Sequence, residues 1–263
     1  MPPLVDITAA SISKQGHRPE ENEDAWAISQ ADHAMFAAVS DGATESVYAR
    51  EWANALSRSF IDPEPWRSWL EAKTVIPGTF HERTDHARAA WKESVDASME
   101  AVQDDVPWYV IEKREQGAFA TVLGLALFFP VDDEHGSGRI LAASIGDCGL
   151  FRVDAQTPGA DRLSAEWAWP HDDPDVFTHR PELVSSRQSA AGSGAQMQFL
   201  EDEWAPGDVF VLGTDAVAAW LLREKPLLPT ADADAKAWLQ GAQADGRLRN
   251  DDSTLVILRT SAR

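Results

Sequence analysis

Short apolar runs rich in β-branched and aromatic residues recur along this chain, and they constrain its fold more than any other feature. Each run is bounded by Gly, Pro, Asp or Ser, as strands usually are. The runs lie at Met35–Val39, Phe119–Phe129, Ile140–Ile145, Leu150–Val153, Val209–Leu212 and Thr254–Leu258. The link between Phe129 and Arg139 is rich in Asp, Gly and Ser, which predicts a hairpin loop between two long strands.

Helical spacing of apolar residues marks three other stretches. Apolar side chains recur every three or four residues over Ala49–Phe60, with Thr44 as a candidate N-cap, and again over Ala87–Val102 and Ala235–Ala242. The stretch Leu163–Gln196 shows neither pattern, so we expect a long irregular surface excursion, of the kind that often serves as a lid or binding flap. Strands and helices in separate blocks predict an α+β fold over antiparallel sheets rather than a βαβ repeat.

Length and charge exclude several classes of protein. The 263 residues suit one large domain or two small ones, and no linker or internal repeat is visible. A net charge of −20 would repel nucleic acids and anionic membranes. The first residues have no signal-peptide pattern, and the longest apolar stretch, Val122–Pro130, is shorter than the roughly 20 residues that span a bilayer. We therefore expect a soluble, cytoplasmic protein.

Its single cysteine, Cys148, excludes an intrachain disulfide and a cysteine-based zinc site.

Acidic residues stand where the apolar runs begin or end, often beside a glycine. The pattern occurs at five places: Asn22-Glu23-Asp24, Asp41-Gly42, Gly146-Asp147, Gly213-Thr214-Asp215 and Asn250-Asp251-Asp252. Turn chemistry alone explains any one of them, because Asp-Gly is a common turn pair and Asp often caps a loop. Five together suggest carboxylates that converge at one edge of the sheets.

Converging carboxylates repel one another unless positive charge lies between them. Mg²⁺ and Mn²⁺ prefer oxygen ligands and supply that charge. Two such ions about 3.5–4 Å apart can lower the pKa of a bridging water and polarise a phosphoryl oxygen. The sequence therefore favours a metal-dependent hydrolase that needs no protein nucleophile.

The sequence resembles the metal-dependent serine/threonine phosphatases of type 2C, particularly their bacterial branch. Six short motifs occur in the order that this family has, between residues 22 and 258. They are Asn22-Glu23-Asp24-Ala25, Val39-Ser40-Asp41-Gly42, Gly117-Ala118-Phe119-Ala120-Thr121, Ile145-Gly146-Asp147-Cys148, Gly207-Asp208 with Leu212-Gly213-Thr214-Asp215, and Asp251-Asp252-Ser253-Thr254 with the strand after it.

The resemblance implies a fold and a role for each matching residue. It implies a four-layer α-β-β-α sandwich over residues 1–263 as one phosphatase domain, with two Mn²⁺ or Mg²⁺ ions and possibly a third. Asp41 would bridge the two ions, with the Gly42 carbonyl as a further ligand, and Arg18 would bind the substrate phosphate. Asp215 and Asp251 would be direct ligands, Asp147 a ligand of the third ion, and Glu23 and Asp24 would act mainly through coordinated waters. The substrate would be a protein phosphorylated on serine or threonine, in signalling opposed to a serine/threonine kinase.

The chain also departs from the family pattern. Ala43-Thr44-Glu45 stands where the family has a residue followed by Gly-Gly, Ala216 replaces a glycine, Cys148 replaces a serine, and the segment around Phe177–Pro181 matches the family flap poorly. Ala43 cannot act as a general acid. Two alternatives therefore stay open: a non-catalytic phosphatase-like module that binds a partner, and a phosphomonoesterase for small molecules.

Overall fold

Two antiparallel sheets of five strands each form the centre of the computed structural model, which describes residues 4–44, 46–102, 115–129, 137–154, 165–177, 180–187, 196–229 and 231–261. The first sheet has the order β1 (Leu4–Ile12), β12 (Ser253–Ser261), β11 (Asp208–Gly213), β7 (Gly149–Asp154) and β8 (Ala165–Trp169). The second has the order β10 (Gln198–Trp204), β6 (Gly138–Ile145), β5 (Val122–Phe128), β3 (Ala34–Ser40) and β2 (Ala25–Ala31). A short pair, β4 (Phe119–Ala120) with β9 (Val184–Ser185), lies beside them.

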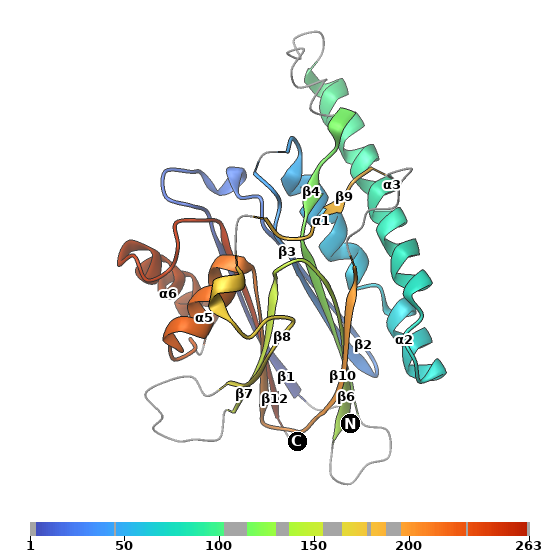
Figure 1. Cartoon of the computed structure of the whole chain (residues 1–263), viewed down its shortest axis with the longest axis vertical. Coiled ribbons are helices and arrows are strands. Elements are labelled where there is room, and N and C mark those ends of the chain that lie inside the picture. The colour runs from blue at the N-terminus through green and yellow to red at the C-terminus, as the bar shows by residue number, and fades with distance from the viewer. Residues whose placement is uncertain are drawn as a thin grey trace.

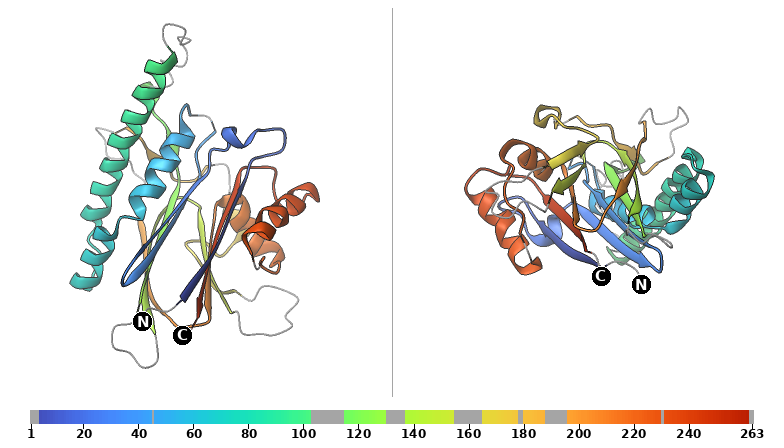
Figure 2. Two further views of the ribbon diagram at one scale, coloured as in Figure 1. Left: turned by 180° about the vertical axis from the view of Figure 1, so that it is seen from behind. Right: turned by 90° about the horizontal axis from the view of Figure 1, so that it is seen from below.

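Helices cover the outer face of each sheet, as Figure 2 shows. The second sheet carries α1 (Ala49–Phe60), α2 (Pro63–Ala72) and α3 (Pro77–Val102), and the first carries α5 (Asp215–Glu224) and α6 (Asp232–Ala244) (Figure 1). Short 3-10 turns lie at Pro19–Glu21 and Pro174–Val176. The predicted four-layer α-β-β-α sandwich is confirmed. Within the described residues, no helix has both the length and the apolar character needed to cross a bilayer.

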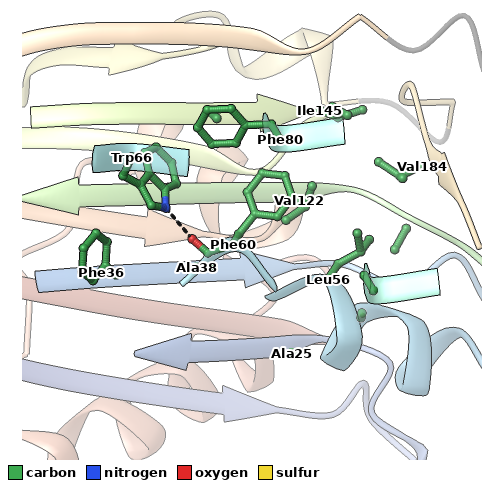
Figure 3. Packing of buried hydrophobic residues seen from close by; sticks show 14 of the residues in the cluster. Ala25, Phe36, Ala38, Leu56, Phe60, Trp66, Phe80, Val122, Ile145 and Val184 are labelled. Atoms are coloured by element: carbon green, nitrogen blue, oxygen red, sulfur yellow. Dashed lines mark hydrogen bonds between the residues drawn. The ribbon is translucent and has the colours of Figure 1, made fainter. Parts of the chain in front are cut away.

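Alternation along the strands explains why the layers hold together. Every residue of β3 is buried, because successive side chains point to opposite faces of the sheet and both faces are covered. Met35, Ala37 and Val39 pack between the two sheets, whereas Phe36 and Ala38 pack under the helices. Aromatic side chains pack among aliphatic ones in the layer beneath α1 to α3 (Figure 3), and the buried indole of Trp66 donates a hydrogen bond to the Phe60 carbonyl at 2.9 Å.

Five of the six predicted strand runs lie within single strands, and the three predicted helices are present. The sixth run, Phe119–Phe129, divides at Thr121 into β4 and β5, which belong to different sheets. The N-cap prediction was wrong. Helix α1 begins at Ala49, and the residue before it, Tyr48, has a left-handed backbone with φ of 63°. Thr44 lies in a separate turn, in which Ser46 Oγ donates to the Ala43 carbonyl at 2.7 Å.

The expected irregular excursion contains strands. Inside Leu163–Gln196, β8 extends the first sheet by pairing with β7, and β9 pairs with β4. Residues 163–164, 178–179 and 188–195 lie outside the described part of the chain, as do residues 130–136 of the predicted hairpin loop. Thr178 and His179 of the expected flap are among them.

Candidate metal centre

The acidic motifs lie at one end of the sandwich. Ala25 at the start of β2 pairs with Ser40 at the end of β3, so Asp24 and Asp41 flank the same register position. Gly213 at the end of β11 pairs with Leu255 near the start of β12, which brings Asp215 and Asp251 to the corresponding end of the other sheet. The opposite end holds the Leu4–Ser261 pair and both chain termini (Figure 1). The expected convergence at one edge is therefore present.

Three of the proposed ligands line one cleft. Asp41, Asp215 and Asp251 border a cavity of about 460 Å³ that Gly42 also lines. Asp147 borders a neighbouring cavity of about 540 Å³, which shares Pro181 with the first.

Asp24 borders a third cavity, of about 400 Å³, between the β1–β2 connection, α1 and α6. Asp24, Asp147 and Asp215 are buried, with 7%, 4% and 8% of their surface exposed, and Asp41 is partly buried.

The charges of these carboxyl groups affect one another's pKa values. Burial raises the pKa of Asp41 well above its ordinary value, and the charges of Asp24, Asp215, Asp147 and Asp251 raise it further. Burial likewise raises the pKa values of Asp24 and Asp215. Burial, with the charge of Asp215, raises the pKa of Asp147 to about 7. Each group is therefore held as an anion only at a cost, which a bound cation would remove.

The Thr214 hydroxyl holds one carboxylate of the cluster in place. The Thr254 amide donates to Thr214 Oγ1 at 3.0 Å, and this hydroxyl donates to Asp24 Oδ2 at 2.9 Å. Asp252, next to Asp251, has a structural role, because it accepts hydrogen bonds from the backbone amides of Lys14 and Glu23 at 2.9 and 2.8 Å. Asp252 thus ties the loop before β12 to the loop before β2.

Two glycines allow close backbone approach at the cluster. A Cβ on Gly42 would lie 2.7 Å from the Glu23 carbonyl oxygen, so only glycine lets these two motifs meet. Gly146 has φ of +96°, and a Cβ there would lie 2.4 Å from Thr121 Cγ2. A left-handed backbone at this position turns the chain at the end of β6 and presents Asp147.

The residues of this cluster fit a hard divalent cation for two reasons. Their donor atoms are oxygens, and several of these oxygens are buried without a hydrogen-bond partner among the described residues. Within the described residues, Asp24 Oδ1, both carboxylate oxygens of Asp147 and Glu23 Oε2 are buried and have no hydrogen-bond partner. Buried oxygens seldom stay unpaired in native proteins without a reason such as an absent ion. No three His, Cys, Asp or Glu side chains of the described ranges already stand close enough to hold one ion. The carboxylates would therefore have to draw together around a metal.

Arg18 and Arg249, which both stand close to acidic motifs in the sequence, differ in position. Arg18 is 77% exposed and pairs with Glu21 at 3.4 Å, and it is not among the described residues that line the Asp41 cleft. Arg249, which sequence reasoning missed, does line that cleft and forms ion pairs with Asp215 and Asp251. The sequence did hold a signal for Arg249, because it stands two residues before Asp251. A positive side chain so near an acidic motif changes the net charge of the site.

Cys148, which follows Asp147, is fully buried. Its sulfur lies 3.1 Å from Thr121 Oγ1. Burial raises the pKa of the thiol well above its ordinary value, and the charge of Asp41 raises it further. The thiol is therefore protonated and unreactive in the folded protein.

Solved structures with the same architecture exist. The chain is similar to RsbX, solved in complex with magnesium, at 14% identity over 98% of this chain and 96% of that one, with a TM-score of 0.50. It is equally similar to PppA, a key regulatory component of T6SS in Pseudomonas aeruginosa, at 14% identity over 98% and 99% of the two chains and a TM-score of 0.50. The chain has the fold of the type 2C phosphatases.

The chain shares this fold with RsbX and PppA at only 14% sequence identity. No protein-family model matches the sequence, and no curated protein matches it.

Proposed function

We propose that this protein is a metal-dependent phosphatase that hydrolyses phosphate monoesters on serine or threonine side chains of proteins, with residues 1–263 acting as one phosphatase domain. One observation carries the proposal: Asp41, Asp215 and Asp251 reach a single cleft from three different strand ends. The type 2C fold supports the same function, as does the order of the six sequence motifs, which resembles that of the type 2C phosphatases. A structure of PstP in complex with 2 manganese ions and the magnesium complex of RsbX suggest the cation, Mn²⁺ or Mg²⁺.

The chain supplies the oxygen ligands. Asp41, Asp215 and Asp251, with the Gly42 carbonyl, would hold two ions, Asp147 would serve a third, and Glu23 and Asp24 would hold coordinated waters. When bound, such ions lower the pKa of water and polarise a phosphoryl oxygen. Asp41 is central because it lies among four other carboxyl groups that raise its pKa.

The protein must also bind a phosphate dianion in an acidic cleft. Arg18 is the proposed phosphate ligand, because a guanidinium matches phosphate with two parallel hydrogen bonds. To do so it would leave Glu21, and an exposed ion pair of this kind costs little to break. We further propose a phosphoprotein substrate in the cytoplasm, opposed by a serine/threonine kinase.

A non-catalytic phosphatase-like module is the second candidate. The observation that favours it is the guanidinium of Arg249, which already supplies positive charge to Asp215 and Asp251. Ala43 and Ala216, at positions where the family pattern differs, fit the same candidate.

Hydrolysis assays separate these functions. We expect turnover of p-nitrophenyl phosphate and of phosphothreonine peptides with Mn²⁺ or Mg²⁺, and none in EDTA. Asp41→Asn should reduce kcat by at least about a hundredfold, because a ligand charge shared by both ions is lost. Asp32→Asn is the matched control, since Asp32 is exposed in the β2–β3 turn at the opposite end of the same strands.

Each outcome selects one function. Full turnover in metal-free buffer would refute the metal-dependent mechanism. Hydrolysis of small esters with no preference for phosphopeptides would favour a small-molecule phosphomonoesterase. Wild-type protein that binds Mn²⁺ but hydrolyses no substrate faster than Asp41→Asn would favour the partner-binding module.

A further inference from the structure

Arg249 lies in the loop between α6 and β12 and contacts one carboxylate of α5 and one of its own loop. Its Nη2 donates to Asp215 Oδ2 at the start of α5 and to Asp251 Oδ2 at 3.1 Å. The side chain is only 33% exposed, and its Nε is buried without a hydrogen-bond partner among the described residues. The guanidinium therefore gives up a hydrogen bond at Nε while it pairs with the two carboxylates.

The cleft around Arg249 is otherwise acidic. Of the described residues that line it, Arg249 is the one with a positive side chain, facing Asp41, Asp215 and Asp251. Burial lowers the pKa of the guanidinium, but the charges of Asp215, Asp251 and Asp41 raise it by more. Because arginine does not lose its proton in proteins, this positive charge is permanent.

We propose that Arg249 is an internal counterion that competes with the divalent cation for Asp215 and Asp251. The inference rests on the proposed function, because both residues are proposed metal ligands. Carboxylate oxygens that accept hydrogen bonds from the guanidinium cannot give the same lone pairs to a metal. Two cations in contact with the same pair of carboxylates also repel each other. The metal therefore binds after Arg249 has moved away.

This competition has a quantitative form. When only a fraction of molecules has the competent arrangement, the apparent dissociation constant is the intrinsic one divided by that fraction. Hydrogen bonds between charged groups, such as the two from Arg249, shift an equilibrium by about tenfold or more each. Arg249 would thus offset part of the carboxylate charge in the metal-free protein, and it would raise the cation concentration at which the site fills.

The test measures Mn²⁺ binding directly, by the loss of the free-ion electron paramagnetic resonance signal on titration. Arg249→Gln removes the charge and keeps a polar side chain. Arg247→Gln is the matched control, because Arg247 lies two residues away and pairs with Asp245 and Glu224 instead of the cluster. We expect Arg249→Gln to bind Mn²⁺ at least about tenfold more tightly than wild type, and Arg247→Gln to bind it as wild type does.

Thermal unfolding gives a second readout without turnover. In EDTA, Arg249→Gln should melt at a lower temperature than Arg247→Gln, and it should gain more in Tm when Mn²⁺ is added. If Arg249→Gln does not fold without metal, Arg249→Lys keeps the charge but loses the planar guanidinium whose Nη2 donates to both carboxylates. Its Mn²⁺ affinity should then lie between those of wild type and a tenfold tighter site.

The outcomes distinguish this inference from the proposed function. Equal or weaker Mn²⁺ binding by Arg249→Gln, or weaker binding by Arg249→Lys, overturns the competition and leaves the metal centre in place. Mn²⁺ binding by Arg249→Gln but not by wild type supports the competition and overturns the metal-dependent phosphatase. If no variant binds Mn²⁺, both proposals are wrong.

Discussion

Replacement of Asp147 by asparagine should stabilise the metal-free protein, although it removes a residue of the candidate site. Asp147 is 4% exposed, and both of its carboxylate oxygens lack a hydrogen-bond partner among the described residues. Burial and the charge of Asp215 raise its pKa from 3.8 to about 7. Asparagine is similar in shape to the protonated carboxyl group and never ionises.

The size and sign of the effect follow from this pKa. Between pH 3.8 and about 7 the folded protein binds a proton at Asp147 that the unfolded chain does not, so the wild-type free energy of unfolding falls as pH rises. At 1.36 kcal/mol for each pKa unit, the loss is about 4 kcal/mol above pH 7 and about 2 kcal/mol at pH 5.5. Asp147→Asn avoids this loss, so its advantage over wild type should grow by about 2 kcal/mol between those conditions.

Urea denaturation at pH 5.5 and pH 8 in EDTA measures both free energies. Asp32→Asn in the exposed β2–β3 turn serves as the control for the exchange of an aspartate for an asparagine. With saturating Mn²⁺ the advantage should shrink or reverse, because the wild-type carboxylate then gains a bound cation. An advantage that is the same at both pH values, or a variant less stable than wild type at pH 8 in EDTA, would refute the reasoning.

Three further substitutions test the phosphate site, the backbone and the core. Arg18→Ala should raise KM for phosphopeptides and leave Mn²⁺ affinity unchanged, which steady-state kinetics and a metal titration would check. Gly146→Ala forces a side chain into a backbone with φ of +96° and against Thr121, so urea denaturation should show a loss of about 2 kcal/mol or more. Trp66→Ala opens a cavity in the layer under α1 to α3 and loses the hydrogen bond to Phe60, so we expect a loss of about 4 kcal/mol by the same measurement.

Apolar periodicity predicted the elements whose burial is strongest. The runs in β3, β5, β11 and β12 are buried on both faces, so their sequences are almost continuously apolar. Strand β10, QFLEDEW, was not predicted, because it lies at the edge of its sheet and its exposed positions carry polar side chains. Helix α2 was not predicted, because its two prolines are typical of a loop. Pro63, however, stands at the first helical position, where proline is tolerated.

Motif order predicted which residues of the site lie at one end of the sheets, but it could not predict their partners. Asp41, Asp215 and Asp251 share a cleft because strands far apart in sequence end at the same register. The contacts of Arg249 depend on a side-chain conformation in a loop, and no spacing in the sequence encodes that conformation. The same holds for Asp252, whose carboxylate accepts hydrogen bonds from backbone amides of Lys14 and Glu23, more than two hundred residues away along the chain.

The burial of Cys148 gives the protein a native chemical reporter. A thiol reagent can reach this fully buried sulfur only when the structure around it opens, so the alkylation rate under native conditions measures how often this end of the sandwich opens. Because the chain has a single cysteine, the signal comes from one place and needs no engineered label. A bound cation that draws the neighbouring carboxylates together would slow the labelling, so metal occupancy could be followed over time even in protein that is given no substrate.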